Sequence, residues 1–153
     1  MTSTTGNIRI EGVGGQGTIL ASDILCAAAM NAGLDAKKSE IHGMSQRGGS
    51  VFSHVRYAPR VYSPVIPRGQ VDIIVALEEM EAARWIDWLV PGGRLVVSGT
   101  RILPANVQTY PEGIVDELKK RAPSCLFIPA DRLLAAAGNE KYVNVFILGA
   151  ASK

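Results

Sequence analysis

The sequence is short of cysteine, of net charge and of long apolar segments, and each shortage narrows the class of protein. Its 153 residues include two cysteines, Cys26 and Cys125, and neither belongs to a C-x-x-C pair. The sequence therefore suggests no zinc or iron–sulfur site, and a reduced, cytoplasmic setting is favoured. A net charge of +2 is too balanced for a nucleic-acid binder. No apolar stretch approaches transmembrane length, so we expect no membrane partner.

Sets of catalytic residues are also missing. We find no plausible Ser/His/Asp or Cys/His arrangement, no metal-ligand spacing and no obvious pair of acid–base carboxylates. A self-sufficient enzyme is expected to show at least one of these sets. The sequence therefore predicts a subunit that binds and positions other groups.

A glycine-rich turn near the N-terminus is the strongest feature that is present. An alternating apolar segment leads into Gly12-Val13-Gly14-Gly15-Gln16-Gly17, and an alanine-rich segment follows at once. This G-x-G-x-x-G spacing allows a tight turn, close approach of a ligand to the backbone, and close packing of a helix on a strand. The helix beginning at Thr18 would then offer unpaired N–H groups to an anion. The plainer alternative is a tight strand–helix connection that binds nothing.

Dinucleotide-binding domains also carry a carboxylate about 20 residues further on, at the end of the second strand. Asp35 precedes most of the strand that we predict at Leu34–Ser39. Glu40 is better placed, but it is followed by the unusual continuation Ile41-His42-Gly43. The nucleotide interpretation is therefore only half supported.

A second polar, glycine-rich segment, Glu40–Ser50, lies between two predicted strands, where functional loops are common. Arg47 followed by Gly48 and Gly49 places a forked cation beside exposed backbone donors, which suits a phosphate or a carboxylate. An arginine that only bonds loop carbonyls is an equally good alternative. For His42, a hydrogen-bonded loop position is favoured over a catalytic role.

Strands and helices alternate along the whole chain, so residues 1–153 are predicted to form a single α/β domain. We expect a doubly wound, largely parallel sheet with helices on both faces, as in Rossmann-like folds. Right-handed crossovers would place both glycine-rich loops at the carboxyl edge of the sheet, bordering one cleft. Further strands are predicted at 51–57, 71–76, 95–98 and 125–128, with weaker candidates at 61–63 and 107–110. Helices are predicted at 18–32, 78–89, 113–121, 132–137 and from 142 onward.

Three details of these elements are also predicted. The first helix is expected to form one apolar face from Ile19, Leu20, Ile24, Leu25, Ala28 and Ala29. Asp131 is placed where a helix N-cap belongs, and Pro91-Gly92-Gly93 is expected to end the helix before it in a turn. Trp85 and Trp88 are interpreted as core or subunit-contact residues.

Two motifs resemble the gamma-type domain of 2-oxoacid:ferredoxin oxidoreductases. They are the glycine turn at 12–17 and the segment His42-Gly43-Met44-Ser45-Gln46-Arg47-Gly48-Gly49, which is most similar to the beta subunit of the indolepyruvate branch. The resemblance extends over nearly the whole chain. It departs at the C-terminus, where members usually continue into more helix, so we expect a C-terminal tail or a partner to cover the apolar segment there.

The resemblance implies a subunit of an enzyme that oxidatively decarboxylates arylpyruvates with coenzyme A (CoA), yielding aryl-acetyl-CoA, carbon dioxide and reduced ferredoxin. Thiamine diphosphate and iron–sulfur clusters would be held by a larger alpha subunit. The isolated chain would be inactive, and a homo-oligomer is possible in isolation. By motif position, the residues near CoA would be Gly12, Gly14, Gly15, Gln16, Gly17, Thr18, Arg47, Gly48 and Gly49. A free-standing Rossmann-type dinucleotide-binding module and a purely structural lid remain as alternatives.

Overall fold

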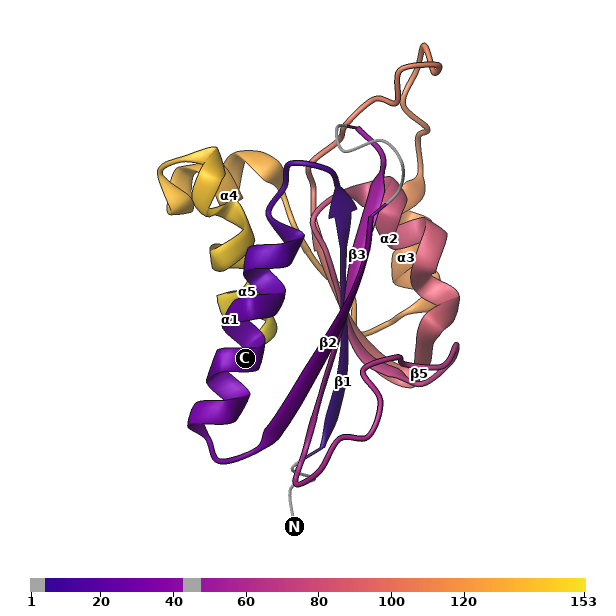
Figure 1. The fold of residues 1–153 in the computed structure, drawn as a ribbon. Coiled ribbons are helices and arrows are strands. Elements are labelled where there is room, and N and C mark those ends of the chain that lie inside the picture. Colours follow the sequence, from indigo (N-terminus) through magenta and orange to yellow (C-terminus); the bar gives the residue numbers. More distant parts are fainter. Residues whose placement is uncertain (1–4, 43–47) are drawn as a thin grey trace.

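The computed structural model describes residues 5–42 and 48–153. Within these ranges, six strands form one sheet in the order β2-β3-β1-β4-β5-β6 (Figure 1). The strands are β1 (Gly6–Val13), β2 (Asp35–His42), β3 (Ser50–Ala58), β4 (Val71–Ala76), β5 (Leu89–Ser98) and β6 (Leu126–Ile128). β3 is antiparallel to both of its neighbours, whereas β1, β4, β5 and β6 pair in parallel. The predicted α/β, largely parallel fold is confirmed, with one reversed strand.

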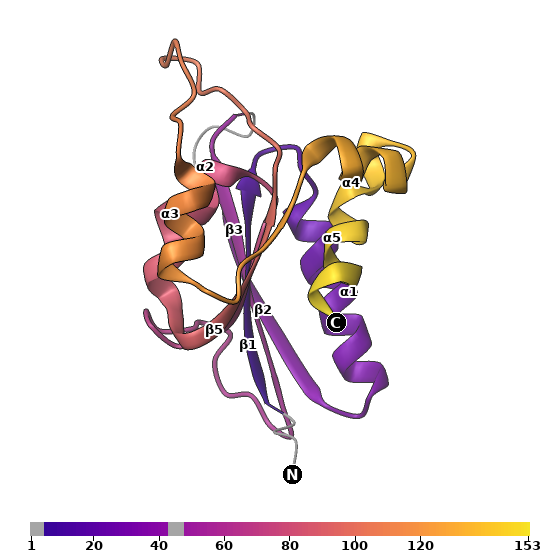
Figure 2. The ribbon, with the colours of Figure 1, turned by 180° about the vertical axis from the view of Figure 1, so that it is seen from behind.

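Helices cover both faces of the sheet (Figures 1 and 2). One face carries α1 (Thr18–Asn31), α4 (Ala130–Ala137) and α5 (Val143–Ala151), with the 3-10 turn η2 (Glu140–Tyr142) between the last two. The other face carries α2 (Glu79–Trp85), the 3-10 turn η1 (Ile86–Trp88) and α3 (Ile114–Arg121). Each helical layer encloses its own apolar core against the sheet, so both faces of the central strands are buried.

β1 sends different side chains to the two faces because successive residues of a strand alternate. Ile8 and Ile10 enter the core beneath α1, whereas Arg9 and Glu11 point toward α2 and are fully buried. The Arg9 guanidinium lies 2.6 Å from the Glu11 carboxylate and 3.9–4.2 Å from the ring centroids of Phe52, Trp85 and Trp88. Cation–π contacts and the ion pair compensate the lost hydration of Arg9. Both tryptophans are half-buried and pack against Arg9, which supports the core part of their interpretation.

The predicted apolar face of α1 is wrong for its largest part, although Leu25 does pack against the core. Ile19, Leu20 and Ile24 are 39%, 51% and 36% exposed. The residues of α1 that are buried are Thr18, Ala21, Ser22 and Cys26. These follow the true helical spacing of three or four residues, whereas the expected face combined adjacent positions that point in different directions. The buried side chains that face the sheet are thus small ones, with Leu25 packed beside them.

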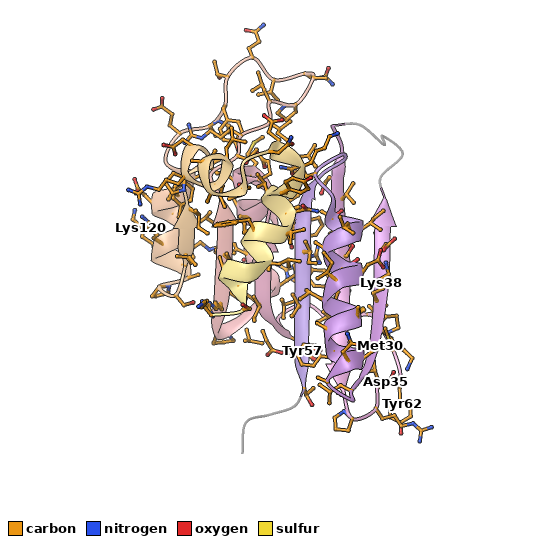
Figure 3. The ribbon with its side chains drawn as sticks, turned by 90° about the vertical axis from the view of Figure 1, so that its left-hand side faces the viewer. Met30, Asp35, Lys38, Tyr57, Tyr62 and Lys120 are labelled. Atoms are coloured by element: carbon orange, nitrogen blue, oxygen red, sulfur yellow. The ribbon has the colours of Figure 1, made fainter. Side chains whose placement is uncertain are left out.

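Several boundaries also differ from the predictions. β2 continues to His42, so Glu40 lies in a strand. β2 is an edge strand of the sheet. Lys38, labelled on this strand in Figure 3, forms an ion pair with Asp23 on α1. β5 begins at Leu89 and runs through Pro91-Gly92-Gly93 with a register shift against β4, so the expected turn there is wrong.

Two weaker expectations fail as well. The candidate strands at 61–63 and 107–110 are loop. Asp131 lies in the first turn of α4 rather than at its N-cap, which is Pro129, because the helix begins two residues earlier than the pattern suggested. Among the described helices, none is long and apolar enough to cross a membrane.

Candidate functional site

The glycine turn joins the carboxyl end of β1 to the start of α1. Gly15 and Gly17 have φ angles of 99° and 80°, in the left-handed region that glycine adopts without strain. Gly17 is the N-cap of α1, and it provides no side-chain cap for the first helical N–H groups. A Cβ atom on Gly17 would lie 2.4 Å from Asn144 Nδ2, which donates a hydrogen bond of 3.1 Å to the Gly17 carbonyl. Both conformation and packing therefore require glycine at this position.

The two glycine-rich loops meet at this edge of the sheet. The Gly14 amide donates to the Gly49 carbonyl at 2.9 Å, and the hydroxyl of Ser50, just after Gly49, donates to Glu81 on α2. Arg47, like Gly43, Met44, Ser45 and Gln46 of the same motif, lies outside the described residues. The structure thus places the end of the second loop beside the first turn and leaves the predicted role of Arg47 as a prediction.

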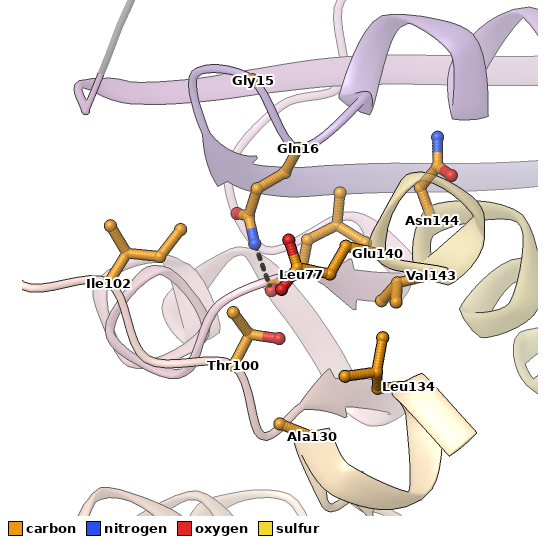
Figure 4. Close-up of a pocket in the computed structure, with 10 residues that line it drawn as sticks. All are labelled: Gly15, Gln16, Leu77, Thr100, Ile102, Ala130, Leu134, Glu140, Val143 and Asn144. Atoms are coloured by element: carbon orange, nitrogen blue, oxygen red, sulfur yellow. Dashed lines mark hydrogen bonds between the residues drawn. The ribbon is translucent and has the colours of Figure 1, made fainter. Parts of the chain in front are cut away.

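Gln16 connects two neighbouring strands through its side-chain amide. Its Oε1 accepts from the Val13 amide, and its Nε2 donates to the Leu77 carbonyl just after β4, both at 2.8 Å (Figure 4). A Cβ atom on Gly12 would lie 2.9 Å from this Oε1, so Gly12 leaves room for the bridge. Gln16 therefore holds the shape of the turn with both ends of its amide.

A cleft of about 370 Å³ opens beside the turn, at the carboxyl ends of the parallel strands (Figure 4). The residues that line it are Gly15, Gln16, Leu77, Thr100, Ile102, Ala130, Leu134, Glu140, Val143 and Asn144. Its walls are mostly apolar with a few polar groups, which is usual for a small-molecule site at the edge of an α/β sheet. Among the described lining residues, Glu140 is the one charged side chain. Gly48 and Gly49 lie next to the turn but are not part of this lining.

Sequence reasoning identified the turn but missed the opposite wall of the cleft. Thr100 and Ile102 come from the loop after β5, and Leu134, Glu140 and Val143 come from the C-terminal helices. These residues form no local motif, and only the folded topology brings them to the turn. The contact of Asn144 with Gly17 joins residues that are 127 positions apart, so it could not be read from the sequence.

The family described as pyruvate ferredoxin/flavodoxin oxidoreductase matches residues 7–153. The chain belongs to this family. Two curated relatives are the indolepyruvate oxidoreductase subunits IorB of Thermococcus kodakarensis and Archaeoglobus fulgidus. The first is 39% identical over 156 residues, covering 96% of this chain and 76% of the relative. The second is 40% identical over 149 residues, covering 94% and 74%.

Solved structures of the family share the fold. The gamma subunit of a keto/oxoacid ferredoxin oxidoreductase from Geobacter sulfurreducens is 26% identical with a TM-score of 0.64, covering 95% of this chain and 75% of that chain. A 2-oxoglutarate:ferredoxin oxidoreductase from Magnetococcus marinus, solved with 2-oxoglutarate, CoA and succinyl-CoA bound, has a TM-score of 0.68 at 21% identity, covering 97% and 24%. The predicted resemblance is confirmed: this chain is a subunit of an oxoacid oxidoreductase.

Proposed function

We propose that this chain is the small subunit of an indolepyruvate-type 2-oxoacid:ferredoxin oxidoreductase and that its cleft helps to bind CoA. The identity of 39–40% to relatives named indolepyruvate oxidoreductase subunits supports the branch. The enzyme would decarboxylate an arylpyruvate oxidatively, giving aryl-acetyl-CoA, carbon dioxide and reduced ferredoxin. The observation that carries the CoA role is the position of the cleft against a glycine turn whose following helix has no side-chain cap.

The turn suits the phosphates of CoA. The uncapped first turn of α1 directs N–H groups and the positive end of the helix dipole toward the carboxyl edge of the sheet. Gly15 is exposed, and the space where its side chain would lie is open. The amides of Gly14 and Gln16 are bonded to Gly49 and Val13, so phosphate contacts fall to Gly15, Gly17 and Thr18.

The described part of the cleft supplies no positive side chain, while Glu140 contributes a negative one. A ligand with several phosphates therefore needs a cation from elsewhere. Arg47, two residues before Gly49, is the candidate within this chain, and the larger subunit can supply others across the cleft. The apolar walls at Leu77, Ile102 and Val143 would contact the uncharged parts of CoA.

This chain's own cysteines do not fit an iron–sulfur cluster. Cys26 lies in the core beneath α1, whereas Cys125 packs against the core beneath α2 and α3, on the other face of the sheet. No group of three or more His, Cys, Asp or Glu side chains in the described ranges is arranged to hold a metal. We assign the clusters and thiamine diphosphate to the larger subunit, against which the exposed Ile19, Leu20 and Ile24 would be buried.

The dinucleotide alternative is disfavoured by the order of the strands. In a dinucleotide-binding domain the ribose carboxylate ends the strand next to β1. Here β3 separates β2 from β1, and Glu40 on β2 is paired with Lys38. The carboxylate at the expected spacing is thus one strand away from the turn and already bonded.

The test is co-expression of this chain with the larger subunit, followed by steady-state kinetics of the Arg47→Lys variant. We expect a raised KM for CoA with an unchanged melting temperature, because lysine keeps the charge but loses the forked geometry. Arg132→Lys, on the exposed surface of α4, is the matched control. An unchanged KM for CoA in the Arg47 variant would remove the phosphate-clamp role.

A further inference from the structure

The loop between β5 and α3 forms the wall of the cleft opposite the glycine turn. It rises above the carboxyl edge of the sheet (Figures 1 and 2), and Thr100 and Ile102 near its start line the cleft. Most of the loop between 101 and 109 is exposed, so packing alone does not hold it in place. Specific bonds at its two ends must fix its position.

The outgoing end of the loop is bonded to the first turn of α2. The Thr100 carbonyl accepts from the Glu79 amide at 3.1 Å, and the Ile102 amide donates to Glu78 Oε1 at 3.2 Å. Arg101 adds an ion pair with Glu79 at 3.0 Å.

The returning end of the loop is bonded to the same turn through Tyr110. Its hydroxyl donates to Glu78 Oε1 and accepts from the Met80 amide at 2.9 Å. Burial and the Glu78 carboxylate raise the pKa of Tyr110 well above its usual value, so the hydroxyl stays protonated and remains a donor. Glu78 thus receives bonds from both ends of one loop.

The Glu78 carboxylate has no access to water, so it depends on hydrogen-bond donors from the protein. Its exposed fraction is 0%, and its carboxylate accepts from Glu81 N, Ile102 N and the Tyr110 hydroxyl. A buried carboxylate is stable only while such donors remain in place, because water cannot replace a lost one. The loop, the start of α2 and the cleft wall are therefore coupled through one side chain.

We propose that Glu78 and Tyr110 are positioning residues that hold Thr100 and Ile102 as the fixed wall of the cleft and so set its affinity for CoA. This inference rests on the CoA role proposed above. If loss of these bonds leaves the wall fixed in only about a tenth of the molecules, the apparent dissociation constant for CoA rises about tenfold. The site works normally once CoA fills it.

The experiment uses the complex with the larger subunit and compares Tyr110→Phe, Glu78→Gln and the double variant. We expect each single variant to raise the KM for CoA about tenfold with kcat unchanged at saturating CoA. The double variant should cost less than the sum of the singles, because both changes act on the same contact between Tyr110 and residue 78. Tyr62→Phe is the control: this tyrosine is 83% exposed and lies at the opposite end of the sheet (Figure 3).

Hydrogen–deuterium exchange of the wild-type complex separates failure of this inference from failure of the CoA role. CoA should slow exchange in segments 13–20 and 98–103. Absence of that protection would overturn both proposals. Protection in the wild type together with an unchanged KM in Tyr110→Phe would overturn the positioning role alone. A lower kcat at unchanged KM would also overturn it, since loss of folded complex reduces the amount of active enzyme without altering KM.

Discussion

Replacing Gly17 with alanine tests the packing between the glycine turn and α5. An alanine at this position would have to adopt the left-handed conformation of Gly17, at φ 80°, and its Cβ would lie 2.4 Å from Asn144 Nδ2. The conformation costs about 1 kcal/mol, loss of the Asn144 hydrogen bond about 1 kcal/mol, and the forced movement of Asn144 about 1–2 kcal/mol. We expect the free energy of unfolding to fall by about 3–4 kcal/mol in total.

Gly33 provides a matched control at the other end of α1. Its φ angle is 81°, but nothing lies within 4 Å of the position of its Cβ, so Gly33→Ala should show the conformational cost without the clash. Urea denaturation of the purified protein, followed by circular dichroism, measures both variants against the wild type. Equal destabilisation of the two variants would refute the packing argument. In the double variant Gly17→Ala/Asn144→Ala, relief of the clash should recover part of the loss.

Three further outcomes follow from charged groups. Glu140→Gln should lower the KM for CoA by about twofold to fivefold, because it removes a negative charge from the cleft. Glu117→Gln on α3 is the control. A raised KM in the Glu140 variant would contradict this account. Burial, with a smaller contribution from Arg9, lowers the pKa of His54 to about 4. The folded state thus favours the neutral ring. The free energy of unfolding should therefore fall by up to about 3 kcal/mol as the pH drops from 6.5 through 4. The same slope in His54→Gln would exclude His54 as its source. Arg9→Met should lower the free energy of unfolding by about 3–5 kcal/mol, because Glu11 is left buried without its cation. The double variant Arg9→Met/Glu11→Leu should recover most of this loss in the same denaturation assay. A double variant no more stable than the single variant would contradict this expectation.

Local features of the fold were readable from the sequence because their causes are local. The turn at 12–17, the helix at 18–31 and the buried strand at 71–76 each depend on residues within a few positions of one another. The direction of β3 was not readable, because the alternation of a strand is the same in either direction. The buried Arg9 was not anticipated either, since its three aromatic partners come from two other segments.

The site was predicted in part for the same reason. The motif located the turn, but the bridge that the Gln16 side chain makes between β1 and the end of β4 could not be read from it. Glu78 and Tyr110 are 32 residues apart, and no spacing rule connects them. The predicted apolar face of α1 was wrong for Ile19, Leu20 and Ile24 because it combined adjacent positions that strict helical geometry separates.

The most direct test of the central claim is an assay of the co-purified complex for arylpyruvate-dependent ferredoxin reduction with and without CoA. We predict that this chain co-purifies with a larger subunit that carries thiamine diphosphate and iron–sulfur absorbance, and that ferredoxin reduction requires CoA. A chain that purifies alone, with a melting temperature raised by a dinucleotide and not by CoA, would contradict the account.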